Sequence, residues 1–322
     1  MNTNELSAKK FLVDVLPRYG FYLFFALLIA VFALLSPTFL TFGNIVGILL
    51  QSTSIGIAVV GMTFVILTAG IDLSAGTTIF FSATICGHLI GNGSGLVTVI
   101  PAAILCGAVM GAINGVAIAR FKVTPFIATL ATMTFGRGLT LTFSQAKAQY
   151  LSGEIQNMLM NSNMAGIPTI VLCMLLVFVV GDVVLRWTPF GRWIYAIGHN
   201  DAAAEKIGLS VVRIKFTAYL IAGITAGIAG LISSVRVGAV MPSLGMGQEF
   251  VIISCAVLGG VSLFGGKGHA LPGALVGVLI ISCIENGLVL INANPYLYTV
   301  VRGVVIYLSV MIDSIQNRGE LR

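Results

Sequence analysis

The chain has 322 residues, of which 57% are hydrophobic and only 9% are Asp, Glu, Lys or Arg. Because a soluble domain usually carries about a quarter charged residues, this composition excludes an ordinary water-soluble protein and indicates a surface that faces lipid. The net charge of +6 does not indicate nucleic-acid binding, because the Lys and Arg residues lie in short segments between apolar runs and form no basic stripe. We therefore predict an all-α, polytopic membrane helix bundle.

A helix needs about 20 largely apolar residues to cross the hydrocarbon core of a bilayer. The first apolar run is followed by Ser36, Pro37 and Thr38 rather than by a small-residue cleavage site, so we expect a retained helix. The sequence predicts about ten spans, at roughly 20–36, 45–69, 74–91, 96–119, 125–143, 167–186, 216–235, 249–264, 270–291 and 297–312. Several are short or rich in glycine, so broken or re-entrant segments are an alternative to continuous helices for some of them. Residues 20–312 would form one transmembrane domain, flanked by cytoplasmic segments 1–19 and 313–322.

The distribution of positive charge predicts the orientation of the chain. Lys and Arg accumulate in the cytoplasmic segments of bacterial membrane proteins. With ten spans and a cytoplasmic N-terminus, all of the 17 Lys and Arg residues lie inside except Arg137, Lys147, Arg236 and Arg302. We therefore expect both termini to be cytoplasmic, a longest external loop at about 144–166 and a longest cytoplasmic loop at about 187–215.

Small residues recur at helical spacing in several predicted spans. Helices in membranes associate by close packing over such residues, because lipid tails are as apolar as leucine. The pattern occurs at Gly107, Gly111 and Gly115, at Gly223, Gly227 and Gly230, and at Gly273 and Gly277. It predicts a compact bundle with closely approaching helices, and by itself it indicates no particular function.

Asp72 is flanked by Gly70 and Gly76 within an otherwise apolar stretch. A carboxylate at the bilayer centre costs at least about 2.5–3.5 kcal/mol, so it needs a structural or functional reason. Asp72 or Ser74 can cap the following helix, and a proton or cation site, a gate or a subunit contact are the alternatives. The other polar residues predicted to be buried are Asn114, Arg137, Glu285 and Asn286, and Arg137 could pair with an acidic group that the sequence does not identify. These four, with Asp72, Ser74 and Glu249, are the candidates for gating or translocation.

The predicted cytoplasmic loop differs in character from the other segments. Asn200 or Asp201 can cap a short helix that runs through Glu205 and ends at Gly208. Its alanines would form a small, smooth surface that suits a groove on a partner protein. The candidate contact residues are Gly198, Asn200, Ala203, Ala204, Glu205 and Gly208.

Four stretches, in order along the chain, resemble the permease subunits of ribose-type sugar ABC importers. They are GMTFVILTAGIDLS at 61–74; Asn114-Gly115 with PFIATL at 125–130 and Arg137-Gly138; the loop FGRWIYAIGHNDAAAEKIGLS at 190–210; and LGGVSLFGGKG at 258–268 with Asn286-Gly287-Leu288. The resemblance runs from about residue 36 to residue 313.

The resemblance implies a paired permease of about ten helices per subunit in the bacterial inner membrane. This chain would pair with a second permease copy or a paralogue. A cytoplasmic ABC ATPase subunit would dock on the loop at 187–215, and a periplasmic or lipid-anchored binding protein would deliver a sugar to the permease pair. The chain departs from the family's pattern at His199, where a glycine is usual, and at Val251, where an acid is usual.

No cofactor, metal site or enzymatic activity is expected of this chain itself. Residues Gly265 to Gly268 include a Lys but lack the spacing of a phosphate-binding loop, so ATP and magnesium would belong to the partner ATPase. The Cys and His residues show no metal-ligand spacing, and paired catalytic groups are absent from the sequence. The alternative function is an ion- or proton-coupled secondary transporter that uses Asp72 and Glu285.

Overall fold

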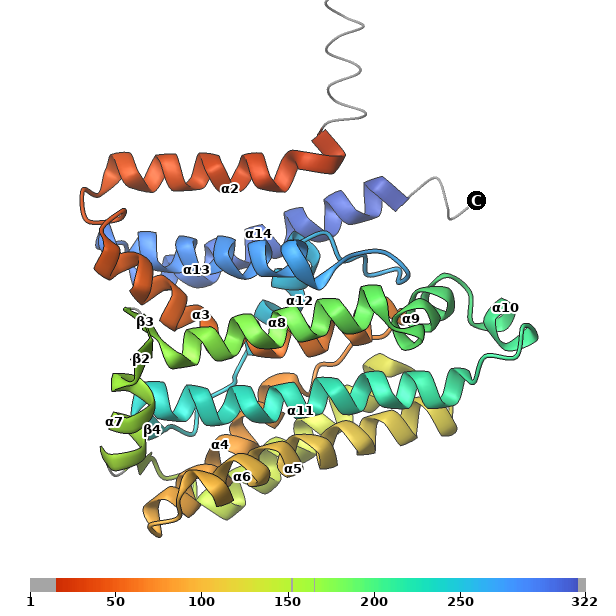
Figure 1. The fold of residues 1–322 in the computed structure, drawn as a ribbon, viewed down its shortest axis with the longest axis horizontal. Helices are drawn as coiled ribbons and strands as arrows, with labels where there is room; N and C mark the ends of the chain where they lie inside the picture. The colour runs from red at the N-terminus through yellow and green to blue at the C-terminus, as the bar shows by residue number, and fades with distance from the viewer. Residues whose placement is uncertain (1–15, 152, 165, 318–322) are drawn as a thin grey trace, which may run out of the picture.

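A computed structural model describes residues 16–151, 153–164 and 166–317 of the chain, so the predicted terminal segments lie partly outside it. The described part is helical almost throughout (Figure 1). The main helices are α2 (Leu16–Leu35), α3 (Phe42–Leu67), α4 (Ala75–Gly91), α5 (Leu96–Gly115), α6 (Pro125–Ser144), α8 (Thr169–Trp187), α11 (Val211–Val237), α12 (Gln248–Leu258), α13 (Leu275–Leu290) and α14 (Pro295–Asn317). Two π-type turns, η2 (Val116–Arg120) and η3 (Ala270–Ala274), adjoin α5 and α13.

Five helical segments of the described residues are long and apolar enough to cross a membrane. They are Phe42–Leu67, Leu96–Arg120, Thr169–Trp187, Val211–Val237 and Ala270–Leu290, and shorter apolar helices lie at Gly20–Leu35, Ala75–Gly91, Gln248–Leu258 and Tyr296–Leu308. The all-α membrane bundle is therefore supported at this level. Each of the ten predicted spans overlaps a helix.

Helix α11 occupies the centre of the bundle and packs against α5, α3 and α4 (Figure 1). Its glycines make this approach possible. A Cβ atom added at Gly223 would lie 2.2 Å from the carbonyl oxygen of Gly107, and one added at Gly227 would lie 2.2 Å from that of Ala103. Backbones that come so close leave no room for a side chain, so the predicted packing role of these glycines is confirmed.

The predicted span at 249–264 is not one continuous helix. Helix α12 has 11 residues, which correspond to about 16 Å at 1.5 Å per residue, too little to cross the hydrocarbon core. After Leu258 the chain turns through Gly259 and Gly260, the second with a φ of +84° that favours glycine, and continues without regular helix to residue 269. The apolar run was misleading because it covers a short helix and the turn that follows it.

The two long predicted loops also contain regular structure. The segment 187–215 contains α9 (Pro189–His199), α10 (Asp201–Lys206) and the first turn of α11. The segment 144–166 contains α7 (Gly153–Asn161) and short strands: β1 (Gln149–Tyr150) pairs antiparallel with β4 (Ala239–Val240), and β2 (Asn163–Met164) pairs with β3 (Ile167–Pro168). Helices α10 and α7 lie at opposite ends of the bundle in Figure 1, and we name these the α10 end and the α7 end.

Candidate functional site

Helix α10 is a short, well-capped helix that projects from the α10 end of the bundle (Figure 1). The side chain of Asn200 accepts a hydrogen bond from the backbone N–H of Ala203 at 2.9 Å, so Asn200 rather than Asp201 is the N-cap. Gly208, with a φ of +87°, ends the helix, and the backbone N–H of Leu209 donates to the carbonyl of Ala204 at 3.1 Å. The predicted helix and its two ends are therefore present.

The predicted contact residues of α10 do not all lie on its surface. Ala203 and Glu205 are exposed, but the side chain of Ala204 is only 2% exposed and belongs to the hydrophobic core. Ile207, at the end of the helix, is 75% exposed although its side chain is apolar. An ion pair between Asp201 and Lys215 holds α10 against the start of α11. The exposed apolar surface of α10 therefore centres on Ala203 and Ile207.

Gly198 places α9 in direct contact with the interior of the bundle. A Cβ atom at Gly198 would lie 1.9 Å from the carbonyl oxygen of Leu67 and 2.4 Å from the backbone nitrogen of Gly266. The N–H of Gly266 donates to that same Leu67 carbonyl at 3.0 Å. The end of α3, the end of α9 and the loop after α12 therefore meet at one point, a junction that the sequence did not reveal because its members are far apart along the chain.

Asp72 lies in the break between α3 and α4 and is 2% exposed. Its Oδ1 accepts hydrogen bonds from the backbone N–H of Ser74 at 2.8 Å and from the Ser74 hydroxyl at 2.6 Å, which forms an Asx turn. The amide nitrogen of Asn114 on α5 donates to the Ser74 hydroxyl at 2.8 Å. Ser74 stands at the N-cap position of α4 without a side-chain capping bond, so this buried network orders the helix start indirectly.

The segment after α11 enters the bundle without regular helix and is held there by Arg137 of α6. The guanidinium group donates to the carbonyl oxygens of Pro242 and Leu244 at 3.1 to 3.2 Å, and its carbon lies 5.0 Å from the centre of the Phe80 ring. Irregular backbone is tolerated inside a membrane only where its polar groups find partners within the protein. Arg137 supplies those partners.

Two glycines bring this segment against the start of α4. A Cβ atom added at Gly245 would lie 2.0 Å from the carbonyl oxygen of Gly76, and one added at Gly76 would lie 2.4 Å from a carboxylate oxygen of Glu249. Glu249 is buried in the first turn of α12, where the positive end of the helix dipole favours an acid. Five of the predicted polar residues therefore lie around two irregular segments, the break between α3 and α4 and the segment between α11 and α12. They are Asp72, Ser74, Asn114, Arg137 and Glu249.

Glu285 and Asn286 of α13 make a separate set of contacts. Glu285 forms an ion pair with Arg302 of α14 and accepts a hydrogen bond from the side-chain amide of Gln51 at 3.1 Å. The amides of Asn286 and Asn44 exchange two hydrogen bonds of 3.0 and 2.9 Å. Glu285 therefore interacts with Arg302 and Gln51, whereas Asp72 interacts with Ser74, so the described contacts place the two acids in separate networks.

Comparison with known proteins places this arrangement in a family. A profile described as "Branched-chain amino acid transport system / permease component" matches residues 44–310. The chain belongs to this family of transport permeases. No solved structure matches it.

Among curated proteins, the relatives are permeases of sugar importers. A ribose import permease of Bacillus subtilis is 39% identical over 97% of this chain and 98% of its own length, and one of Haemophilus influenzae is 37% identical over 89% and 90%. An L-arabinose ABC transporter permease of Azospirillum brasilense is 36% identical over 93% of this chain and 88% of its own length. The chain is thus a multi-pass inner-membrane protein of the ribose-type ABC permease family, as its motifs predicted.

Proposed function

We propose that this chain is the membrane subunit of an importer for a ribose-like monosaccharide or related polyol, driven by ATP hydrolysis in a separate subunit. The curated relatives named for ribose, L-arabinose and D-allose support the substrate class. The observation that carries the mechanism is the capped, exposed helix α10 at one end of the bundle. Inside the bundle, irregular segments lie between α3 and α4, between α11 and α12, and after α12. ATP and magnesium would bind to the partner ATPase, since this chain has no phosphate-binding loop.

The proposed topology has ten membrane segments, with α12 and the loop after it crossing together rather than as a single helix. The start of α2 and the end of α14 both lie toward the α10 end in Figure 1, which supports a placement of both termini on one side of the membrane. The α10 end also carries five basic residues, and this positive charge supports a cytoplasmic location for it. They are Arg120, Arg192, Lys206, Arg213 and Lys215. The α7 end would then face the external sugar-binding protein.

Coupling would pass through the junction that Gly198 forms with Leu67 and Gly266. Closure of the ATPase pair would push on α10, and α9 would transmit this movement to the end of α3 and to the loop after α12. These segments adjoin the break that contains Asp72. Packed bundles have discrete alternative arrangements, so a small displacement at the junction would switch the pathway between its two accessible states. A second permease copy or paralogue would complete that pathway.

Co-purification of the ATPase tests the proposed docking site. Ile207→Asp places a charge on the exposed tip of α10, and Met158→Asp is a matched control, because Met158 is 64% exposed on α7 at the opposite end. We expect Ile207→Asp to lose the ATPase from the detergent-extracted complex and Met158→Asp to retain it, with similar thermal stability of both chains. Equal retention by both variants would show that the ATPase does not dock on α10.

A further inference from the structure

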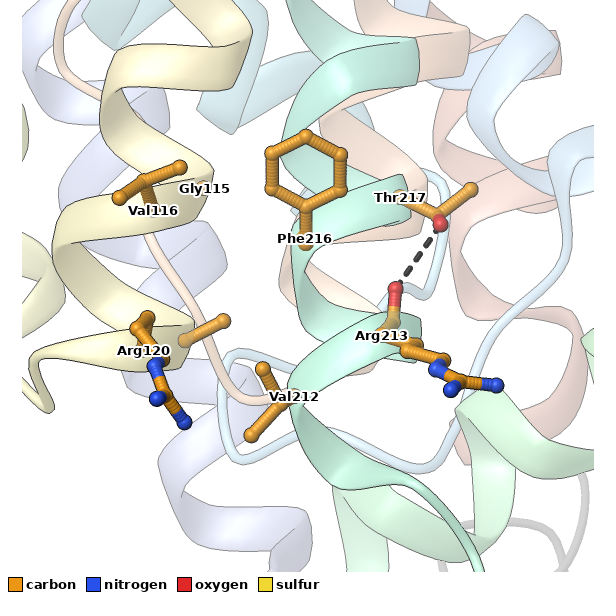
Figure 2. A pocket seen from close by; sticks show the side chains of 8 residues that line it. Gly115, Val116, Arg120, Val212, Arg213, Phe216 and Thr217 are labelled. Carbon is orange, nitrogen blue, oxygen red and sulfur yellow. Dashed lines mark hydrogen bonds between the residues drawn. The ribbon is translucent and has the colours of Figure 1, made fainter.

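A cavity of about 390 Å³ opens between η2 and α11 near the α10 end (Figure 2). Its walls are almost entirely apolar. The one lining hydroxyl, that of Thr217, already donates to the backbone carbonyl of Arg213 at 2.8 Å. The lining residues are Gly115, Val116, Ala119, Arg120, Val212, Arg213, Phe216 and Thr217. A molecule inside the cavity would meet hydrocarbon, whereas its outer end would meet charge.

The helix geometry explains why the space is open. The chain widens from α-helix to a π-type turn at Val116, and Gly115 lies directly against Phe216. A Cβ atom at Gly115 would come within 2.9 Å of the Phe216 ring, so these two residues close the inner end of the cavity. In Figure 2 Arg120 and Arg213 both lie beyond Phe216, toward the start of α11, and their guanidinium groups point away from each other on the two sides of α11.

Arg120 and Arg213 differ from two other basic residues, Arg186 and Lys215, which form ion pairs with acids. Arg186 pairs with Asp182, and Lys215 pairs with Asp201. Among the described residues, the structure records no ion pair for Arg120 or Arg213, and no acidic residue lines the cavity. Both side chains are exposed. An apolar cavity with two unpaired cations at its mouth complements an amphipathic molecule with an anionic head.

We propose that this cavity binds an anionic phospholipid of the cytoplasmic leaflet. The phosphate of the headgroup would lie at the mouth of the cavity, where Arg120 and Arg213 supply positive charge, and the upper part of one acyl chain would lie against Val116, Val212 and Phe216. Basic pockets between transmembrane helices on the cytoplasmic side suit such headgroups, and the leaflet itself is negatively charged. The proposal depends on the topology given above only for the side of the membrane from which the lipid comes.

Native mass spectrometry of the detergent-purified transporter, titrated with phosphatidylglycerol or phosphatidylcholine, tests the proposal. We expect the chain to bind one phosphatidylglycerol in preference to phosphatidylcholine. The double variant Arg120→Gln/Arg213→Gln should weaken this binding about 30-fold, the factor expected from two basic groups near an anionic lipid. The control Arg192→Gln/Lys206→Gln removes the same charge from exposed positions outside the cavity. It should change binding less than 3-fold, which corresponds to a change in binding free energy of about 0.7 kcal/mol. Equal weakening by both double variants would overturn the proposal, because it would show only general attraction to positive charge.

The cavity itself is tested by Val116→Trp, which fills it and keeps both arginines. We expect this variant to lose the preferred lipid while its thermal stability stays close to that of the unaltered chain. Retention of the lipid by Val116→Trp would overturn the proposed placement of the acyl chain. Disulfide formation between two chains carrying Val116→Cys would also overturn it, since a second copy of the chain would then cover the cavity. None of these outcomes depends on the ATPase, so failure here is distinguishable from failure of the importer function.

Discussion

Replacement of Asp72 separates a structural from a charge-dependent role. In Asp72→Asn, the amide oxygen can still accept from the Ser74 N–H and hydroxyl, which are 2.8 and 2.6 Å from Oδ1 in the structure. In Asp72→Ala, one or both of these donors would remain buried without an acceptor. A buried unsatisfied group costs about 1–3 kcal/mol, so we expect Asp72→Ala to lower the free energy of unfolding by about 2–4 kcal/mol and Asp72→Asn by less than about 1 kcal/mol.

The assay is thermal unfolding of the detergent-solubilised chain, combined with ATP-driven sugar uptake. Thr84→Val is a matched control on α4, the helix that follows Asp72, because it removes a fully buried hydroxyl that donates to a carbonyl of its own helix, that of Phe80 at 2.9 Å. We expect the control to change stability by less than about 1 kcal/mol. A stable Asp72→Asn chain that has lost all uptake would refute this reasoning and assign the carboxylate a role that needs its charge.

Three further predictions concern helix packing, an ion pair and partner docking. Gly107→Leu should prevent assembly of the bundle, because its Cβ atom would lie 2.1 Å from a backbone carbonyl oxygen of α11, whereas Gly138→Leu, with nothing within 4 Å, should fold normally by size-exclusion chromatography. Glu285→Gln should destabilise the chain by leaving Arg302 unpaired, and Glu285→Gln/Arg302→Gln should recover part of that loss in a double-mutant cycle. Ile207→Asp should reduce ATP-driven uptake. Its melting temperature should stay within a few degrees of the unaltered chain, since the side chain is 75% exposed. A large fall in melting temperature would contradict its placement at the surface.

The local features of the fold could be predicted from the sequence because they depend on residues close together in the chain. The cap at Asn200, the end of α10 at Gly208 and the glycine pattern of α5 and α11 are all of this kind. Helix α9 was missed because its single apolar face lies within a segment that also carries charge. Span 249–264 is broken, as the alternative for glycine-rich spans allowed, but hydropathy alone did not locate the turn at Gly259 and Gly260 inside the apolar run.

The contacts of the candidate site depend on tertiary structure and could not be predicted. Arg137 donates to the carbonyl oxygens of Pro242 and Leu244, which carry no signal in the sequence. Arg302 was noted only as an exception to the charge distribution, although it is the partner of Glu285. An isolated Arg within an apolar span therefore signals a buried acceptor without revealing whether that acceptor is a side chain or the backbone.

Sugar uptake by proteoliposomes tests the central claim most directly. The chain would be reconstituted with its ATPase, and radiolabelled ribose would be supplied with the binding protein on the external side. The proposed function predicts uptake that requires ATP and its hydrolysis, and that stops when a non-hydrolysable ATP analogue is used. Uptake by the chain alone, driven by a proton or sodium gradient and without ATP, would contradict it.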